Sequence, residues 1–111
     1  MDTTIEVYED VAVCKLSGRL DATSVFDLDE RFQVLVEKEI YKFVINMQHL
    51  SYLSSAGIRL LLSLNTKLSS FSGSICLCEA TGQVADVLRI SGFDKALTIC
   101  EHEQECYGRF I

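Results

Sequence analysis

Two adjacent serines, Ser54 and Ser55, stand where a strand-forming run gives way to a helix-forming run. Ser54 is the expected N-cap of that helix, so Ser55 lies in its first turn, near free backbone N–H groups and the positive end of the helix dipole. A phosphate on Ser55 is accommodated at such a position. The small residues Ala56 and Gly57 leave the neighbouring surface open to another protein. The segment has two interpretations: a phosphoacceptor on a contact surface, or an ordinary capping serine followed by packing residues.

Residue patterns that would support an enzyme are missing. The six glycines are widely spaced, so the chain has no glycine-rich phosphate loop of the Walker or Rossmann type. His49 and His102 are the only histidines, and no Gly-x-Ser-x-Gly nucleophile elbow accompanies them. We therefore expect a protein that is not an enzyme, with no catalytic residue and no cofactor.

The cysteines are odd in number, and three of them fall inside apolar runs that predict strands. This usage favours reduced, buried thiols in a cytoplasmic protein over a disulfide framework. Cysteine and histidine donors near the C-terminus are of the types that bind metals, but their spacing matches no common zinc site. We therefore expect no metal site among Cys14, Cys76, Cys78, Cys100 and Cys106.

Hydrophobic periodicity predicts that strands and helices alternate along the chain and position these residues. The expected order is β-β-α-β-α-β-α-(β), which indicates one α/β domain over residues 1–111, with a mixed, mostly parallel sheet and helices packed against it. Thr23 or Ser24 is the expected N-cap of the first helix, and Gly92 suits a left-handed C-cap of the third. The expected segments are a hairpin over 5–16, helices near 25–36, 58–68 and 84–88, buried strands over 42–47 and 75–78, an edge strand over 97–99 and a charged tail over 101–105.

Charge excludes some partners and is unevenly distributed. The chain of 111 residues has 16 acidic against 10 basic side chains, a formal net charge of −6, which argues against direct binding of nucleic acid. We expect neither a signal peptide nor a membrane span. No carboxylate lies between Ile40 and Cys78, a window that holds Lys42, Arg59 and Lys67. A phosphate near Ser55 would be the only strong negative charge in that stretch of chain.

Three motifs, in order, resemble those of STAS-domain anti-sigma factor antagonists. The run from Asn46 to Arg59 is similar to the family signature, whose usual form is Asp-Ser-(Ser/Ala)-Gly after a central strand. Gly18 to Asp21 matches the family's Gly-x-Leu-Asp, and Ile90 to Lys95 matches its pattern after the third helix. The resemblance spans nearly the whole chain. It departs from the family where Ser54 replaces the aspartate that usually precedes the acceptor serine.

The resemblance implies a cytoplasmic bacterial partner switch. In such proteins the unphosphorylated form binds an anti-sigma factor that is also a serine kinase, and a sigma factor or other client is released. Phosphorylation, here at Ser55 with Ser54 as the alternative, blocks binding, and a PP2C-type phosphatase reverses it. We expect a monomer that acts without nucleic acid or membrane. The partner-binding residues implied by position, with Arg59 added because it lies one helical turn after Ser55, are Asp21, Ser54, Ser55, Ala56, Gly57 and Arg59.

A second function is compatible with the same fold. A STAS domain also serves as a non-phosphorylated scaffold, or as a subunit of a lipid or anion transport assembly. Such modules often lack the acceptor serine, so the hydroxyl at position 55 favours the partner switch.

Overall fold

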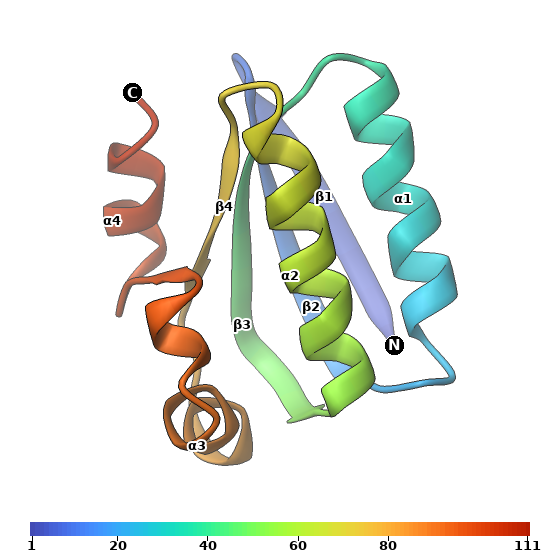
Figure 1. Cartoon of the computed structure of the whole chain (residues 1–111), viewed down its shortest axis with the longest axis vertical. Helices are drawn as coiled ribbons and strands as arrows, with labels where there is room; N and C mark the ends of the chain where they lie inside the picture. Colours follow the sequence, from blue (N-terminus) through green and yellow to red (C-terminus); the bar gives the residue numbers. More distant parts are fainter.

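A five-stranded mixed sheet forms the centre of the molecule, as the computed structural model of residues 1–111 shows (Figure 1). The strands lie side by side in chain order, β1 pairs antiparallel with β2, and all other neighbours are parallel. The elements are β1 (Asp2–Tyr8), β2 (Val11–Leu20), α1 (Val25–Glu37), β3 (Lys42–Leu53), α2 (Ser55–Ser69), β4 (Ser74–Cys78), α3 (Gly82–Ile90), a short 3-10 helix (Phe93–Lys95), β5 (Thr98–Ile99) and α4 (Glu103–Gly108). The predicted α/β class and element order are confirmed, with β3 in the centre of the sheet.

The main hydrophobic core lies between the sheet and helices α1, α2 and α3. The helices bury one apolar stripe each, as their three- and four-residue spacing predicts. Phe32 of α1 meets Phe43 of β3 edge to face, with ring centroids 5.6 Å apart. Figure 1 shows α1 and α2 side by side in front of the strands. This packing fixes the start of α2 against the ends of the central strands.

The opposite face of the sheet has a smaller apolar cluster, which α4 covers. Val13, Val44 and Cys76 point to this side, and Cys106 of α4 packs on them. The predicted charged tail over 101–105 is therefore wrong for its second half, because residues 103–108 form a helical turn with an apolar side. The sequence pattern missed it because six residues are too few to show a helical period.

Two strands are longer than expected. β2 continues past Leu16 through Gly18, whose φ of +104° accompanies an irregular step in the β2–β3 register. β3 continues past Met47 to Leu53, although its second half contains exposed polar residues. The two extensions pair with each other, so neither depends only on the strand propensity of its own residues. They carry the ends of both strands to the start of α2.

The expectation that every cysteine is reduced is wrong for two of them. Cys76 of β4 and Cys106 of α4 form a disulfide, with Cα atoms 5.6 Å apart. The missed helix α4 is the reason, because it places Cys106 directly over β4. Cys14, Cys78 and Cys100 are free thiols, and the first two are buried as expected.

Candidate functional site

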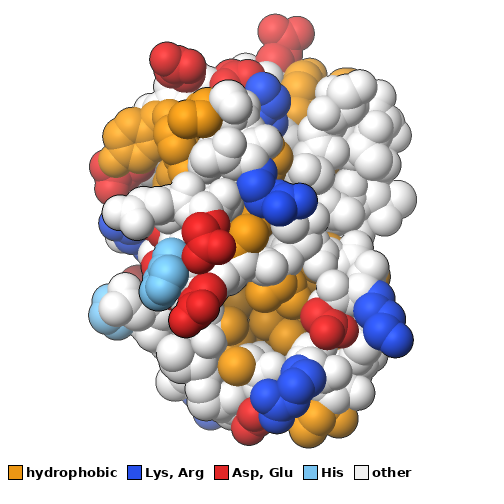
Figure 2. Space-filling model, turned by 90° about the vertical axis from the view of Figure 1, so that its left-hand side faces the viewer, with side chains coloured by type: hydrophobic (Ala, Val, Ile, Leu, Met, Phe, Trp, Pro, Cys, Tyr) orange, Lys and Arg blue, Asp and Glu red, His pale blue; other side chains and the backbone are white.

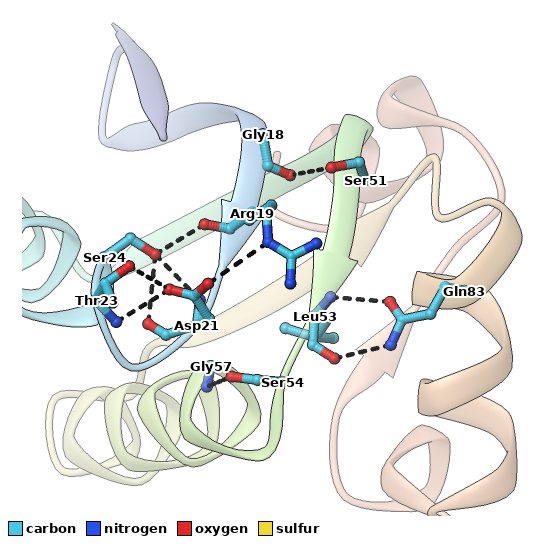
Figure 3. Close-up of polar contacts among 10 residues, drawn as sticks. All are labelled: Gly18, Arg19, Asp21, Thr23, Ser24, Ser51, Leu53, Ser54, Gly57 and Gln83. Carbon is cyan, nitrogen blue, oxygen red and sulfur yellow. Dashed lines mark hydrogen bonds and ion pairs between the residues drawn. The ribbon is translucent and has the colours of Figure 1, made fainter.

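The ends of β2 and β3 meet the start of α2 at one edge of the sheet (Figure 3). The backbone N–H of Ser54 donates a hydrogen bond to the carbonyl oxygen of Leu20, at 3.0 Å. Three residues earlier, in β3, the Ser51 hydroxyl donates a hydrogen bond to the Gly18 carbonyl oxygen at 2.9 Å. Carboxyl ends of neighbouring parallel strands commonly form binding sites. The Asp21 loop and the two serines are thereby held beside each other.

Ser54 is the N-cap of α2, as predicted. Its backbone is extended, with φ −94° and ψ 171°, and its hydroxyl oxygen accepts a hydrogen bond from the N–H of Gly57 at 3.3 Å. Its carbonyl oxygen accepts the first helical hydrogen bond, from Ile58. The side chain is partly buried. The hydroxyl of Ser54 is thus already used in holding the helix end.

Ser55 is the first residue of α2 and differs from its neighbour in its exposure and in the state of its hydroxyl. It is exposed, and its hydroxyl makes no hydrogen bond to the protein. The first turn of α2 contains no acidic residue. Arg59, one turn further along, is also exposed and forms no ion pair. A free hydroxyl, a helix N-terminus and an unpaired guanidinium therefore occupy one exposed end of α2.

Ala56 and Gly57 behave differently from each other. Ala56 is partly exposed beside the serines, whereas Gly57 is buried. A Cβ on Gly57 would lie 2.8 Å from Leu20 Cγ and 2.9 Å from Leu53 Cδ1. The glycine therefore keeps α2 close to β2 and β3, and any contribution that it makes to a partner surface is indirect.

Asp21 begins the loop that follows β2. Its Oδ1 accepts hydrogen bonds from the hydroxyl and the backbone N–H of Thr23, at 2.6 and 3.0 Å, and Arg19 Nε lies 3.6 Å from its Oδ2. The Thr23 hydrogen bonds, helped by the charge of Arg19, lower the pKa of Asp21 below the usual aspartate range. The window from Ile40 to Cys78 lacks carboxylates along the chain. In the folded protein, however, the ionised carboxylate of Asp21 lies beside it.

Ser24 supports this loop instead of capping α1 with its side chain. It is the N-cap residue of α1 by position, as predicted, yet its hydroxyl donates to the Arg19 carbonyl oxygen at 2.8 Å and accepts from the Asp21 N–H at 3.0 Å. The loop is closed by its own side chains. Asp21 is therefore held in place before any partner binds.

Two further contacts at the site have no signal in the sequence. Gln83 of α3 accepts a hydrogen bond from the Leu53 N–H at 2.9 Å, and its amide group donates to the Leu53 carbonyl oxygen at 3.1 Å. The Arg19 guanidinium lies over the Tyr52 ring, 4.1 Å from its centroid. Both contacts join elements far apart in the chain, so no local spacing indicates them. They attach the end of β3 to α3 and to β2.

Groups suited to catalysis do not gather at this edge. His49 and His102 are both exposed, and neither forms a hydrogen bond with a serine hydroxyl or a cysteine thiol, His102 lying instead beside Glu79 and Glu101. None of the helices has the length and the apolar composition that crossing a membrane requires. The arrangement offers an exposed hydroxyl, that of Ser55, on a preformed surface.

Comparison with known proteins agrees with this description. The family model for the STAS domain matches residues 2–106. BtrV of Bordetella bronchiseptica, named as an anti-sigma factor antagonist, is 29% identical over 110 residues, which are 99% of this chain and 95% of BtrV. An anti-sigma factor antagonist from Mycobacterium paratuberculosis superposes with a TM-score of 0.88 at 18% identity, covering 97% of this chain and 92% of its own.

A second solved structure is the Bacillus cell fate determinant SpoIIAA in its phosphorylated form. Its TM-score is 0.76 at 21% identity, over 99% of this chain and 100% of that one. The anti-sigma factor antagonists of this family are regulators without enzymatic activity. The chain belongs to the STAS domain family, with anti-sigma factor antagonists as its relatives in sequence and fold.

Proposed function

We propose that this chain is an anti-sigma factor antagonist that changes partners when Ser55 is phosphorylated. The observation that carries the proposal is the exposed Ser55 hydroxyl, free of hydrogen bonds, at the first position of α2. The unphosphorylated protein binds a serine-kinase anti-sigma factor in the cytoplasm and releases a sigma factor or another client. A PP2C-type phosphatase restores the binding form. The relatives named above, one of them a phosphorylated STAS protein, support this assignment.

The geometry favours Ser55 over Ser54 as the acceptor. A kinase needs an accessible hydroxyl, and the Ser54 hydroxyl is partly buried and accepts the N–H of Gly57. Transfer of a phosphate to Ser54 would remove this cap, which is worth about 1 kcal/mol. Transfer to Ser55 breaks no hydrogen bond.

A phosphate on Ser55 would change the surface without rearranging the fold. It adds about −1.5 to −2 charges at neutral pH. The helix N-terminus stabilises an anion by about 0.3–1 kcal/mol, and Arg59 lies one turn away to pair with it. A partner that packs closely on Ala56 and the Asp21 loop would have to bury this charge. Binding is lost through steric exclusion and desolvation, because buried charges require a partner charge.

Mass spectrometry of the protein incubated with ATP and each serine-kinase anti-sigma factor of its source organism tests the acceptor. We expect one phosphate, lost in Ser55→Ala and retained in Ser54→Ala. Ser70→Ala is the control, because it removes a serine hydroxyl at the opposite end of α2 and should leave the phosphorylation unchanged. Labelling that survives Ser55→Ala and disappears in Ser54→Ala would show that the neighbouring serine is the acceptor.

Binding measurements test the switch itself. Ser55→Asp should bind the kinase at least about tenfold more weakly than wild type, a loss of about 1.4 kcal/mol. Ser55→Ala should bind as wild type does, and circular dichroism should be the same for all three. Equal binding by Ser55→Asp would contradict phosphorylation control and favour a non-phosphorylated scaffold or a subunit of a transport assembly.

A further inference from the structure

Three of the five cysteines meet at one point, remote in the fold from the serines. Cys76 of β4 is disulfide-bonded to Cys106 of α4, and the Cys100 Sγ atom, just after β5, lies 3.6 Å from the Cys76 Sγ atom. All three sulfur atoms lie within 4.8 Å of one another. The backbone holds Cys100 there, because its N–H donates to the Leu77 carbonyl oxygen at 2.8 Å. The third sulfur is therefore in contact with the disulfide.

The three side chains differ in their access to solvent. Cys76 is 1% exposed and Cys106 is 0% exposed, so reagents in solution do not reach the disulfide directly. Cys100 is partly exposed and lines a pocket of about 270 Å³ together with Leu88 and Glu101. Figure 2 shows the face on which α3 and α4 lie, with hydrophobic side chains in a hollow bordered by charged ones. Cys100 is the member of the cluster that an external thiol can contact.

We propose that Cys100 is the exchange thiol of a three-cysteine redox site, through which dithiols in solution reduce the buried Cys76–Cys106 disulfide. The Cys100 thiolate attacks Cys76 Sγ, a Cys76–Cys100 disulfide forms, and the electron pair of the broken bond leaves on Cys106 Sγ, which takes a proton from solvent. A thiolate of the external dithiol attacks Cys100 Sγ and releases Cys76. Its second thiolate then attacks the mixed disulfide and releases Cys100, so the dithiol leaves as a disulfide and the protein holds three thiols.

The remaining two cysteines are matched controls, because neither belongs to the group of three sulfur atoms. Cys14 lies in the main core, and Cys78, although it shares the apolar cluster of Cys76 and Cys106, directs its Sγ atom to the Ile45 carbonyl oxygen at 3.6 Å. Burial raises the pKa of the Cys14 thiol to about 12, and burial with nearby acidic groups raises that of Cys78 to about 12 as well. Exchange requires a thiolate that reagents can reach. Neither Cys14 nor Cys78 meets this requirement.

The redox state would decide how α4 is attached to the sheet. With Cys76 bonded to Cys106, α4 is tied covalently over Val13 and Val44 on the face opposite the main core. Exchange moves the bond to Cys100 and leaves α4 held only by packing and by hydrogen bonds, such as those of Glu103 with Asn46 and Glu79. The amides of residues 103–108 should then exchange faster with deuterium, while those of α2 keep their rates.

Reduction by dithiothreitol, stopped by rapid alkylation and followed by peptide mass spectrometry, tests the proposal. The Cys76–Cys106 disulfide of wild type should disappear through a transient Cys76–Cys100 disulfide. In Cys100→Ser the disulfide should be reduced at least roughly tenfold more slowly, since access limits the rate. Cys14→Ser and Cys78→Ser should follow wild type. Alkylating Cys100 of the oxidised wild type with N-ethylmaleimide should slow reduction equally, without any substitution.

Three outcomes would overturn the proposal. One is reduction of Cys100→Ser and of the alkylated protein at the wild-type rate. Another is the absence of any disulfide among Cys76, Cys100 and Cys106 after treatment with oxidised glutathione. The third is one zinc ion bound per reduced chain that protects all three thiols from alkylation when zinc chloride alone is supplied, which would make the cluster a metal site.

Discussion

Replacing Gly57 by alanine tests how the start of α2 is held against β2 and β3. An added Cβ would lie 2.8 Å from Leu20 Cγ, 2.9 Å from Leu53 Cδ1 and 3.1 Å from the Leu20 carbonyl oxygen. Both leucines are buried, at 0% and 1% exposure, so they have no free space into which to move. Inserting a methyl group into such a site costs about 1–3 kcal/mol, whereas alanine gains about 0.8–1.0 kcal/mol over glycine inside a helix. We expect a net loss of about 1 kcal/mol.

Urea unfolding followed by circular dichroism measures this loss. With a urea m-value of about 1–3 kcal/mol/M, the midpoint of Gly57→Ala should fall by roughly 0.5 M. Gly108→Ala is the matched control, since a Cβ there meets nothing within 4 Å. It should be unchanged or more stable by up to about 1 kcal/mol, because the unfolded chain loses freedom.

The substitution should also disturb the surface proposed for partners. Moving Leu20 lengthens the hydrogen bond that its carbonyl oxygen accepts from the Ser54 N–H, so the Ser54 amide should exchange faster with deuterium. Gly57→Ala protein that is as stable as wild type, with an unchanged Ser54 amide, would refute this reasoning. It would show that the strand ends adapt to α2 instead of fixing it.

Three other changes should have defined outcomes. Gln83→Ala leaves the N–H and carbonyl oxygen of Leu53 without partners and should lower the free energy of unfolding by about 1–3 kcal/mol in urea titrations; an unchanged midpoint would mean that water replaces the amide. The Asp21 pKa is lowered, so its contribution to stability is present above the usual aspartate range and is lost as the pH falls through the folded pKa. Thr23→Ala should raise that pKa in an NMR titration, and an unmoved pKa would point to another cause. At pH 8 iodoacetamide should label Cys14 only after unfolding, because a thiol of pKa about 12 is almost entirely protonated there.

Much of the fold follows from local patterns that the chain shows plainly. The run from Ile75 to Cys78 is apolar throughout and became β4, covered on both faces. The Ser54 N-cap and the left-handed Gly92, with φ +72°, follow from preferences of single residue types. The extension of β3 to Leu53 does not, because its polar residues are held there by pairing with β2.

The candidate site, too, has residues that the local sequence indicates and contacts that it does not. Ser54, Ser55 and Asp21 were indicated by residue type and by motif, because capping and loop chemistry depend on near neighbours. Gln83 was not, since its partner Leu53 lies 30 positions away and the contact exists only once α3 is packed. The disulfide between Cys76 and Cys106 was missed for the same reason, because the two cysteines are separated by 30 positions in the chain.

The order of the sheet, in which each strand lies beside its predecessor in the chain, has a consequence for how the protein forms during synthesis. The hairpin, α1 and β3 can bury Phe32 against Phe43 before β4 has left the ribosome, because no later strand inserts between them. β4 and β5 then add to an edge that is already ordered. Helix α4 is made after all five strands, so its disulfide joins a sheet that exists without it and does not guide the earlier pairing.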